Sequence, residues 1–150
     1  MSLNSRALQH FLFAVLLATA VGTVVQTQFN LAAIQAIGAP VPLDVRLRTT
    51  GLDLLGFSPT FGALVFVGFL FAIPLAAWIS HALPVLHWLL FAAAGGLAVL
   101  LALILANAVA PMPTLIGANR TLLGTLGLMA SGSVGALLYT WLRRPFAANP

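Results

Sequence analysis

The chain has 150 residues, of which 61% are hydrophobic and only 5% are charged. A soluble domain carries roughly a quarter of its residues as Asp, Glu, Lys or Arg, so this composition excludes a water-soluble globular protein. The net charge of +4 comes from six arginines against two aspartates without a dense basic patch, which argues against a nucleic-acid partner. Cysteine is absent, which excludes disulfides and thiolate metal sites.

Residues 7–30 form the first predicted membrane-spanning helix, because they open on an apolar run of the length that crosses a bilayer. Polar residues follow residue 25 without a helix breaker, so the helix is expected to project a turn or two beyond the hydrocarbon. On a helical wheel, Gln26 and Asn30 lie opposite Gln28 and Gln35, which predicts contacts on several sides of this helix end. An arginine followed by an apolar run also resembles a cleavable signal peptide, but we expect this segment to be retained as a membrane helix.

The segment between the first two spans is the most structured external loop that the sequence predicts. Residues 43–48 alternate apolar with charged side chains, which fits either an extended strand or a helix. In a helix, Asp44 and Arg48 are four residues apart and would pair while the helix lies on the membrane surface. Residues 50–53 resemble a capping box with Asp in place of Glu, which predicts a separate short helix that ends before Gly56.

Two further spans are predicted at residues 59–79 and 86–109, within a long stretch that lacks charged residues. Residues 80–84 separate them, because this segment combines a polar pair with a proline. A Ser-Pro pair marks the start of the earlier span. Pro74 should bend the same helix, and the bend is either a packing kink or a gating hinge.

Residues 120–142 form the fourth predicted span, which is bounded by arginines at both ends. Gly127, Ser131 and Gly135 recur at every fourth position and make a ridge of small residues, which permits close helix approach within one chain or between subunits. In the preceding span, Asn107 is the clearest polar residue. An amide in hydrocarbon must find a partner, so Asn107 is expected either to link helices or to line a solute path.

These elements predict an all-α membrane protein, a four-transmembrane-helix bundle with a structured external loop between helices 1 and 2. We expect a single integral membrane domain over residues 1–150. The arginines divide equally between the two faces, so the positive-inside rule favours neither orientation clearly. Both aspartates lie on one face, whereas four aromatic residues lie on the other face together with the termini. We therefore expect an inner-membrane protein of a bacterium with both termini in the cytoplasm. Dual insertion is the alternative. The four aromatic residues are Trp78, Trp88, Tyr139 and Trp141.

The face opposite the termini collects five of the eight formal charges and is the best candidate site. Its residues could pin the loop to the helix ends, or they could recognise an anionic solute or a lipid headgroup. The candidate ligand or pathway residues are Gln26, Asn30, Asp44, Arg46, Arg48, Asp53, Asn107 and Arg120. Three histidines share the other face without the arrangement of a metal or haem site, and no cofactor is expected.

The predicted function is that of a small oligomeric membrane protein, a channel or transporter that moves a small solute or lipid. A non-catalytic subunit or scaffold of a larger membrane complex is the alternative, because the spans contain few polar groups. An enzyme is less favoured, since the sequence has no nucleotide-binding glycine loop and no zinc-protease motif. The expected partners are membrane lipids and either further copies of the chain or a membrane partner protein.

Overall fold

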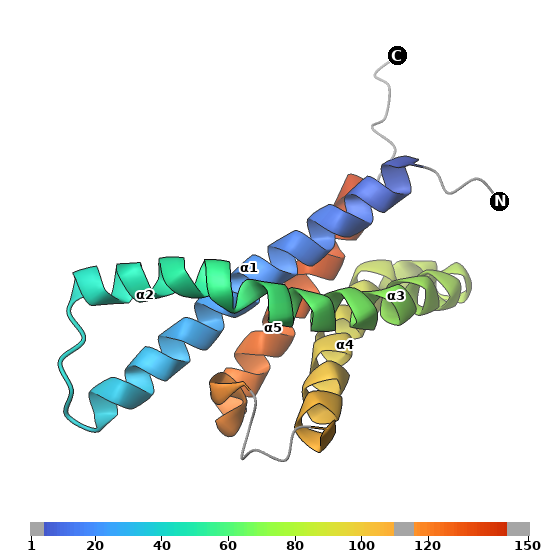
Figure 1. Ribbon diagram of the computed structural model, residues 1–150. Helices are drawn as coiled ribbons and strands as arrows, with labels where there is room; N and C mark the ends of the chain where they lie inside the picture. Colours follow the sequence, from blue (N-terminus) through green and yellow to red (C-terminus); the bar gives the residue numbers. More distant parts are fainter. Residues whose placement is uncertain (1–4, 110–115, 144–150) are drawn as a thin grey trace.

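The computed structural model describes residues 5–109 and 116–143, and every regular element in these ranges is helical (Figure 1). The elements are α1 (Ser5–Ala36), α2 (Leu43–Gly56), α3 (Ser58–Ala82), the short 3₁₀ helix η1 (Pro84–Leu86), α4 (His87–Val109), the 3₁₀ helix η2 (Gly117–Arg120) and α5 (Leu122–Leu142). In the described ranges α1, α3, η1 with α4, and α5 are long and apolar enough to cross a membrane. The predicted fold class is confirmed.

The polar residues after residue 25 do not end the first helix. α1 has 32 residues, which correspond to about 48 Å at 1.5 Å per residue, whereas the hydrocarbon of a bilayer is only about 30 Å thick. α1 is therefore longer than a straight crossing requires and continues past residue 25 without a break, as predicted, and the other three spans begin and end within three residues of their predicted limits.

α2 is one continuous helix, which confirms the helical alternative for residues 43–48. The separate helix predicted to start at residues 50–53 is wrong. The Thr50 hydroxyl donates to the carbonyl oxygen of Arg46, one turn earlier, at 2.8 Å. Thr50 therefore lies inside a helix and bonds back to its own backbone instead of capping a new first turn.

α5 is the central helix of the bundle, with α1 on one side and α4 on the other (Figure 1). Small residues allow these close contacts: Gly135 lies against Ala14 and Ala18 of α1, and Gly132 meets Gly95 of α4 backbone to backbone. α3 completes the bundle by packing against α4 and α1.

α2 leads into α3 almost without interruption through Phe57, whose backbone is helical. The Phe57 N–H donates to the Asp53 carbonyl oxygen at 2.8 Å, and the Phe61 N–H donates to the Phe57 carbonyl oxygen at 3.1 Å. Pro59 falls in the first turn of α3, where its missing donor is tolerated. α2 and α3 consequently follow one another in a similar direction in Figure 1, which holds Asp53 about one turn before α3.

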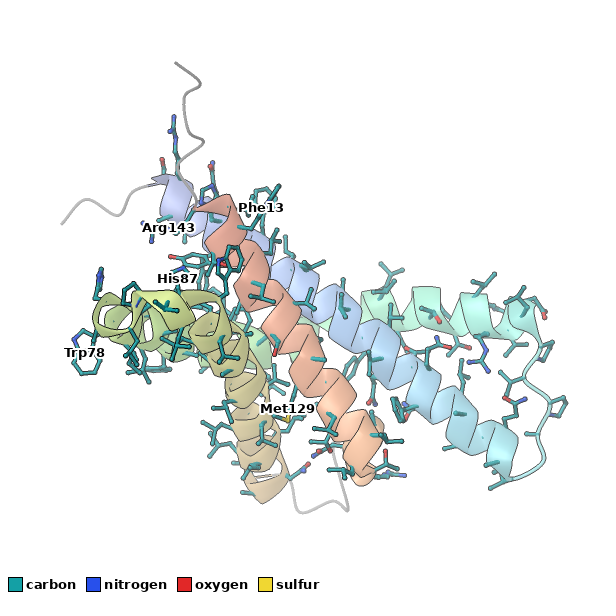
Figure 2. The ribbon with its side chains drawn as sticks, turned by 180° about the vertical axis from the view of Figure 1, so that it is seen from behind. Phe13, Trp78, His87, Met129 and Arg143 are labelled. Carbon is teal, nitrogen blue, oxygen red and sulfur yellow. The ribbon has the colours of Figure 1, made fainter. Side chains whose placement is uncertain are left out.

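Aromatic and basic side chains meet where the end of α5 packs against the start of α4, near His87 and Arg143 (Figure 2). The Arg143 guanidinium donates to the Tyr139 hydroxyl at 2.9 Å, and its carbon lies 5.6 Å from the centre of that ring. The Phe91 ring stacks on Tyr139 with 6.1 Å between centres, and the His87 ring lies 4.8 Å from Phe91. These contacts join the end of α5 to the start of α4.

Candidate functional site

The polar face of α2 is turned toward α1. Arg46, Thr50 and Asp53 share one face of α2 because they are four and three residues apart. The Arg46 guanidinium donates to Gln28 Oε1 at 2.6 Å and to Gln35 Oε1 at 3.4 Å. Gln28 Nε2 donates in turn to Thr50 Oγ1 at 3.1 Å. This polar seam, formed by Gln28, Gln35, Arg46 and Thr50, holds α2 against the C-terminal end of α1.

Asp53 lies where α1, α2 and α3 meet. The fully buried Thr27 hydroxyl donates to Asp53 Oδ2 at 2.7 Å and lies 2.9 Å from the Thr23 carbonyl oxygen. One turn deeper, Thr23 Oγ1 and Ser58 Oγ are 2.9 Å apart and share a hydrogen bond. Carboxylate, hydroxyl and carbonyl oxygens therefore form a polar cluster at the junction of the three helices.

A stripe of buried threonines continues this cluster into the bundle. Thr19, Thr23 and Thr27, which we call the threonine stripe, recur at every fourth residue of α1 and are each at most 7% exposed. They cover about 12 Å along the helix axis. The Thr19 hydroxyl has no hydrogen-bond partner within the described part of the chain. It faces Gly62 of α3, where a Cβ atom would lie 3.2 Å from Thr19 Oγ1.

The threonine stripe is closed beyond Thr19. The next buried residues on the facing sides of the two helices are apolar, with Val15 on α1 and Val65 and Phe69 on α3. Further along, the rings of Phe11 and Phe66 meet edge to face with 5.4 Å between centres. The polar cluster therefore ends at the half-buried Asp53 on the face that carries α2, and apolar side chains close it toward the face that carries the termini.

Gln26 and Asn30 contact a different side of α1. Gln26 Oε1, in a buried position, accepts a hydrogen bond from the Ala118 N–H of η2 at 2.8 Å. Gly117 approaches Asn30 so closely that a Cβ atom at residue 117 would overlap the Asn30 side-chain oxygen. Since Gln28 contacts α2 instead, the predicted contacts on several sides of this helix end are confirmed.

A pocket of about 420 Å³ adjoins Asn30 between α1 and η2. Its polar groups come from Asn30, Arg120 and Thr121, and α1 supplies apolar side chains. We call it the Arg120 pocket. Its lining residues are Phe29, Asn30, Ala33, Ile34, Ile37, Gly117, Ala118, Arg120 and Thr121.

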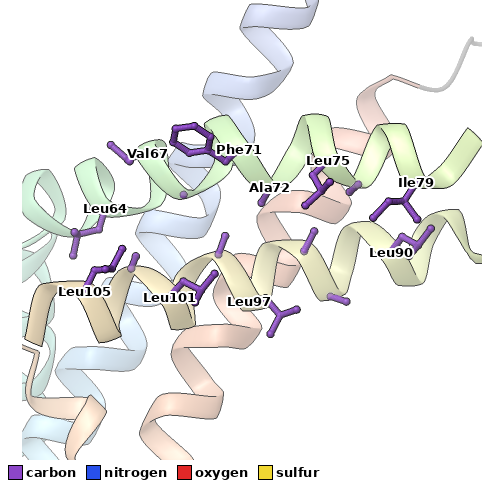
Figure 3. Close-up of a pocket in the computed structure, with 16 residues that line it drawn as sticks. Leu64, Val67, Phe71, Ala72, Leu75, Ile79, Leu90, Leu97, Leu101 and Leu105 are labelled. Atoms are coloured by element: carbon purple, nitrogen blue, oxygen red, sulfur yellow. The ribbon is translucent and has the colours of Figure 1, made fainter. Parts of the chain in front are cut away.

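A larger groove of about 600 Å³ runs between α3 and α4 on the outer surface of the bundle (Figure 3). Every residue that lines it is apolar, from Leu64 to Ile79 on α3 and from Leu90 to Leu105 on α4. Gly68 and Ala98 lie where the two helices touch, since a Cβ atom at Gly68 would be 3.3 Å from the Ala98 backbone oxygen. We call this surface the apolar groove; it offers no group that could orient a polar ligand.

The other predicted residues lie apart from the polar cluster. Asp44 and Arg48 are exposed on α2, and Asn107 is half-buried near the end of α4. The small-residue ridge is turned toward α1, because Gly127 approaches Val25 and Gly135 approaches Ala14. The third member of the ridge, Ser131, is buried and bonds back to its own helix.

The sequence did not single out Thr23, Thr27 and Ser58 as site residues. A hydroxyl on a membrane helix usually bonds to its own backbone and carries little information. The usable signal was the spacing of Thr19, Thr23 and Thr27, which places three hydroxyls on one face of an otherwise apolar helix.

Four long apolar helices define this chain as a four-span integral membrane protein, and its partly buried polar cluster lies where two of them, α1 and α3, meet α2. No family model, curated protein or solved structure matches it. Within residues 5–109 and 116–143 there is no group of three or more His, Asp, Glu or Cys side chains that could hold a metal ion. The polar cluster and the two cavities are therefore the candidate functional features of the described residues.

Proposed function

We propose that this protein is a transporter for a small cation, which enters at Asp53 and moves along the threonine stripe. The observation that carries the proposal is the buried hydroxyl of Thr19, which has no partner in the described part of the chain and lies at the inner end of the stripe. A buried polar group without a partner is costly. A cation that exchanges its hydration shell for protein oxygens would supply the missing interaction.

The chemistry of the cluster favours a cation over an anion or a lipid. Asp53 brings a carboxylate, and Thr27 and Thr23 add hydroxyl and carbonyl oxygens within hydrogen-bond distance of one another. Oxygen atoms of these types are the ligands of hard cations. An ionisable residue at the membrane edge that leads into buried hydroxyls is typical of an ion pathway.

The apolar seal beyond Thr19 favours a transporter over an open channel. Passage to the other face requires Val15, Val65 and Phe69 to separate, so the pathway needs a second conformation. Pro74 interrupts the backbone bonding of α3 farther along, and it is a position at which that helix could bend. We also propose that the face with Asp53 is extracytoplasmic, in keeping with the aromatic residues at the other face.

Ion flux into proteoliposomes tests the proposal. The purified chain is reconstituted, and gradients of H⁺, Na⁺ and K⁺ are imposed in turn while internal dyes report entry. Asp53→Asn should lower the flux about tenfold, because the loss of one charge-assisted interaction is worth roughly 1.5–3 kcal/mol. Asp44→Asn is the matched control, because Asp44 is exposed on the same helix. Flux no faster than in empty liposomes for all three cations contradicts the proposal.

Thr19→Val separates a transport role from a structural one. Valine has nearly the shape of threonine, and the Thr19 hydroxyl makes no hydrogen bond to the described residues that the change would break. The variant should therefore keep or raise the melting temperature while it lowers the flux. Unchanged flux in Thr19→Val would show that the inner end of the stripe is not used.

The apolar groove supports a second candidate, a subunit of a membrane complex that packs one helix of a partner between α3 and α4. The groove is lined by hydrocarbon and small residues, which suit a transmembrane helix. A photocrosslinking residue at Leu97, which is 51% exposed in the groove, should then capture a protein in native membranes, whereas one at Leu16 on α1 should not. The mass of the product distinguishes a second copy of the chain from another protein.

A further inference from the structure

The α1–α2 hairpin turns three polar side chains of α2 inward and exposes several leucines, although Asp44 and Arg48 are exposed as well. Arg46, Thr50 and Asp53 face α1, whereas Leu47 and Leu55 of α2 are 65% and 79% exposed. A helix that projects into water shows the opposite pattern. Hydrocarbon surroundings remove the cost of exposed leucines and raise the cost of exposed polar groups.

The Arg120 pocket lies on a different side of α1 and combines the two chemistries of a lipid. α5 has 21 residues and covers about 31 Å, which matches the hydrocarbon thickness, so its first turn marks the membrane edge. Arg120 precedes this turn and is exposed, so a first turn of α5 at the membrane edge would set Arg120 among the headgroups. Ile34 and Ile37 on the wall of the same pocket are 43% and 84% exposed.

We propose that the Arg120 pocket binds an anionic phospholipid, with the phosphate on Arg120 and an acyl chain against α1. The guanidinium presents parallel donors that match two phosphate oxygens. The Asn30 amide and the Thr121 hydroxyl line the same pocket and offer further donors. Phe29 and Ile34 form the apolar wall that accepts the chain. A soluble phosphate would use the polar end and leave this wall in water.

Native mass spectrometry of the purified full chain tests the proposal with two lipids that share acyl chains. Phosphatidylglycerol should bind about tenfold more tightly than phosphatidylcholine, because only its headgroup has a net negative charge for Arg120. Arg120→Gln should abolish this preference. Arg48→Gln is the matched control, because Arg48 is exposed on α2 and does not line the pocket. Equal binding of both lipids to the unaltered chain overturns the proposal.

Two further variants decide the remaining outcomes. If Arg120→Gln fails to fold, Arg120→Lys keeps the charge without the planar pair of donors, and it should retain a preference only a few-fold above one. Ile37→Ser should weaken phosphatidylglycerol binding without strengthening phosphatidylcholine binding, because it removes part of the contact with the acyl chain. Displacement of the lipid by millimolar inorganic phosphate would show a site for a soluble anion instead. Equal losses in Arg120→Gln and Arg48→Gln would show a diffuse charge effect, and either result overturns the lipid site.

Discussion

The contact between α4 and α5 depends on the absence of two side chains, and Gly132→Ala tests it. A Cβ atom at Gly132 would overlap the backbone oxygen of Gly95 and lie 2.6 Å from Val99 Cγ2. The backbone oxygen cannot move by a change of rotamer, so the two helices must separate. A Cβ atom at Gly95 would overlap the Gly132 backbone oxygen in the same way, which makes the contact reciprocal.

The size of the effect follows from two opposing contributions. Overpacking against a fixed neighbour costs roughly 1–3 kcal/mol, and the upper part of this range applies because the neighbour is backbone. Alanine in place of glycine in a helix returns about 0.5–1 kcal/mol. Gly132→Ala should therefore lower the free energy of unfolding by about 2 kcal/mol, which corresponds to a fall in the melting temperature of about 5 °C.

Thermal unfolding in detergent, followed by tryptophan fluorescence, measures this change against two other alanine variants. Gly51→Ala on α2 has no atom within 4 Å of the new Cβ and should stabilise its helix. Gly127→Ala should fall between the two, because its nearest neighbour is the Val25 side chain at 2.9 Å, which can rotate. Equal melting temperatures for Gly132→Ala and Gly51→Ala would refute the close backbone contact.

Three other changes should have measurable effects. Gln26→Leu leaves the buried Ala118 N–H without its acceptor, and it should cost roughly 1–3 kcal/mol in unfolding and speed hydrogen exchange at that amide. Thr121→Ala removes the side-chain cap of α5, and a loss of about 0.5–2 kcal/mol is expected in the same melting assay. For orientation, single cysteines at the exposed positions Leu47 and Leu83 should label from outside and from inside respectively; reversed labelling in intact cells would place the termini outside.

The four spans could be predicted from the sequence because hydropathy and helix breakers act locally. A run of about 20 apolar residues must cross the bilayer whatever its neighbours are. The approximate limits of α3, α4 and α5 followed from Ser-Pro, from the break at residues 80–84 and from the flanking arginines.

The orientation of α2 could not be predicted in the same way. Its pairing partners are Gln28 and Gln35, which precede Arg46 by 18 and 11 residues and belong to another helix. Before that helix is in place, the charged residues of α2 fit a surface helix with its polar side outward equally well. The bond from Ala118 to Gln26 spans 92 residues and gives no local signal at all.

The division of the predicted candidate site into two parts needed the structure. On the sequence, Asp53 and Arg120 are both the last charge before a long apolar span, so both were assigned to one candidate site. In the fold, Asp53 bonds to Thr27, whereas Arg120 shares a pocket with Asn30. These contacts use different sides of α1.

This separation predicts a double dissociation, because each ligand meets only one of the two charges. Asp53→Asn should lower cation flux in proteoliposomes and leave the preference for phosphatidylglycerol unchanged. Arg120→Gln should remove the lipid preference and change the flux less than Asp53→Asn does, since a guanidinium outside the polar cluster acts on a cation only at long range, screened by salt. The two assays use the same two proteins, and melting temperatures establish that both fold. Parallel losses of flux and lipid preference in both variants would show that the two sides of α1 form one coupled site, and the separate assignments would then be wrong.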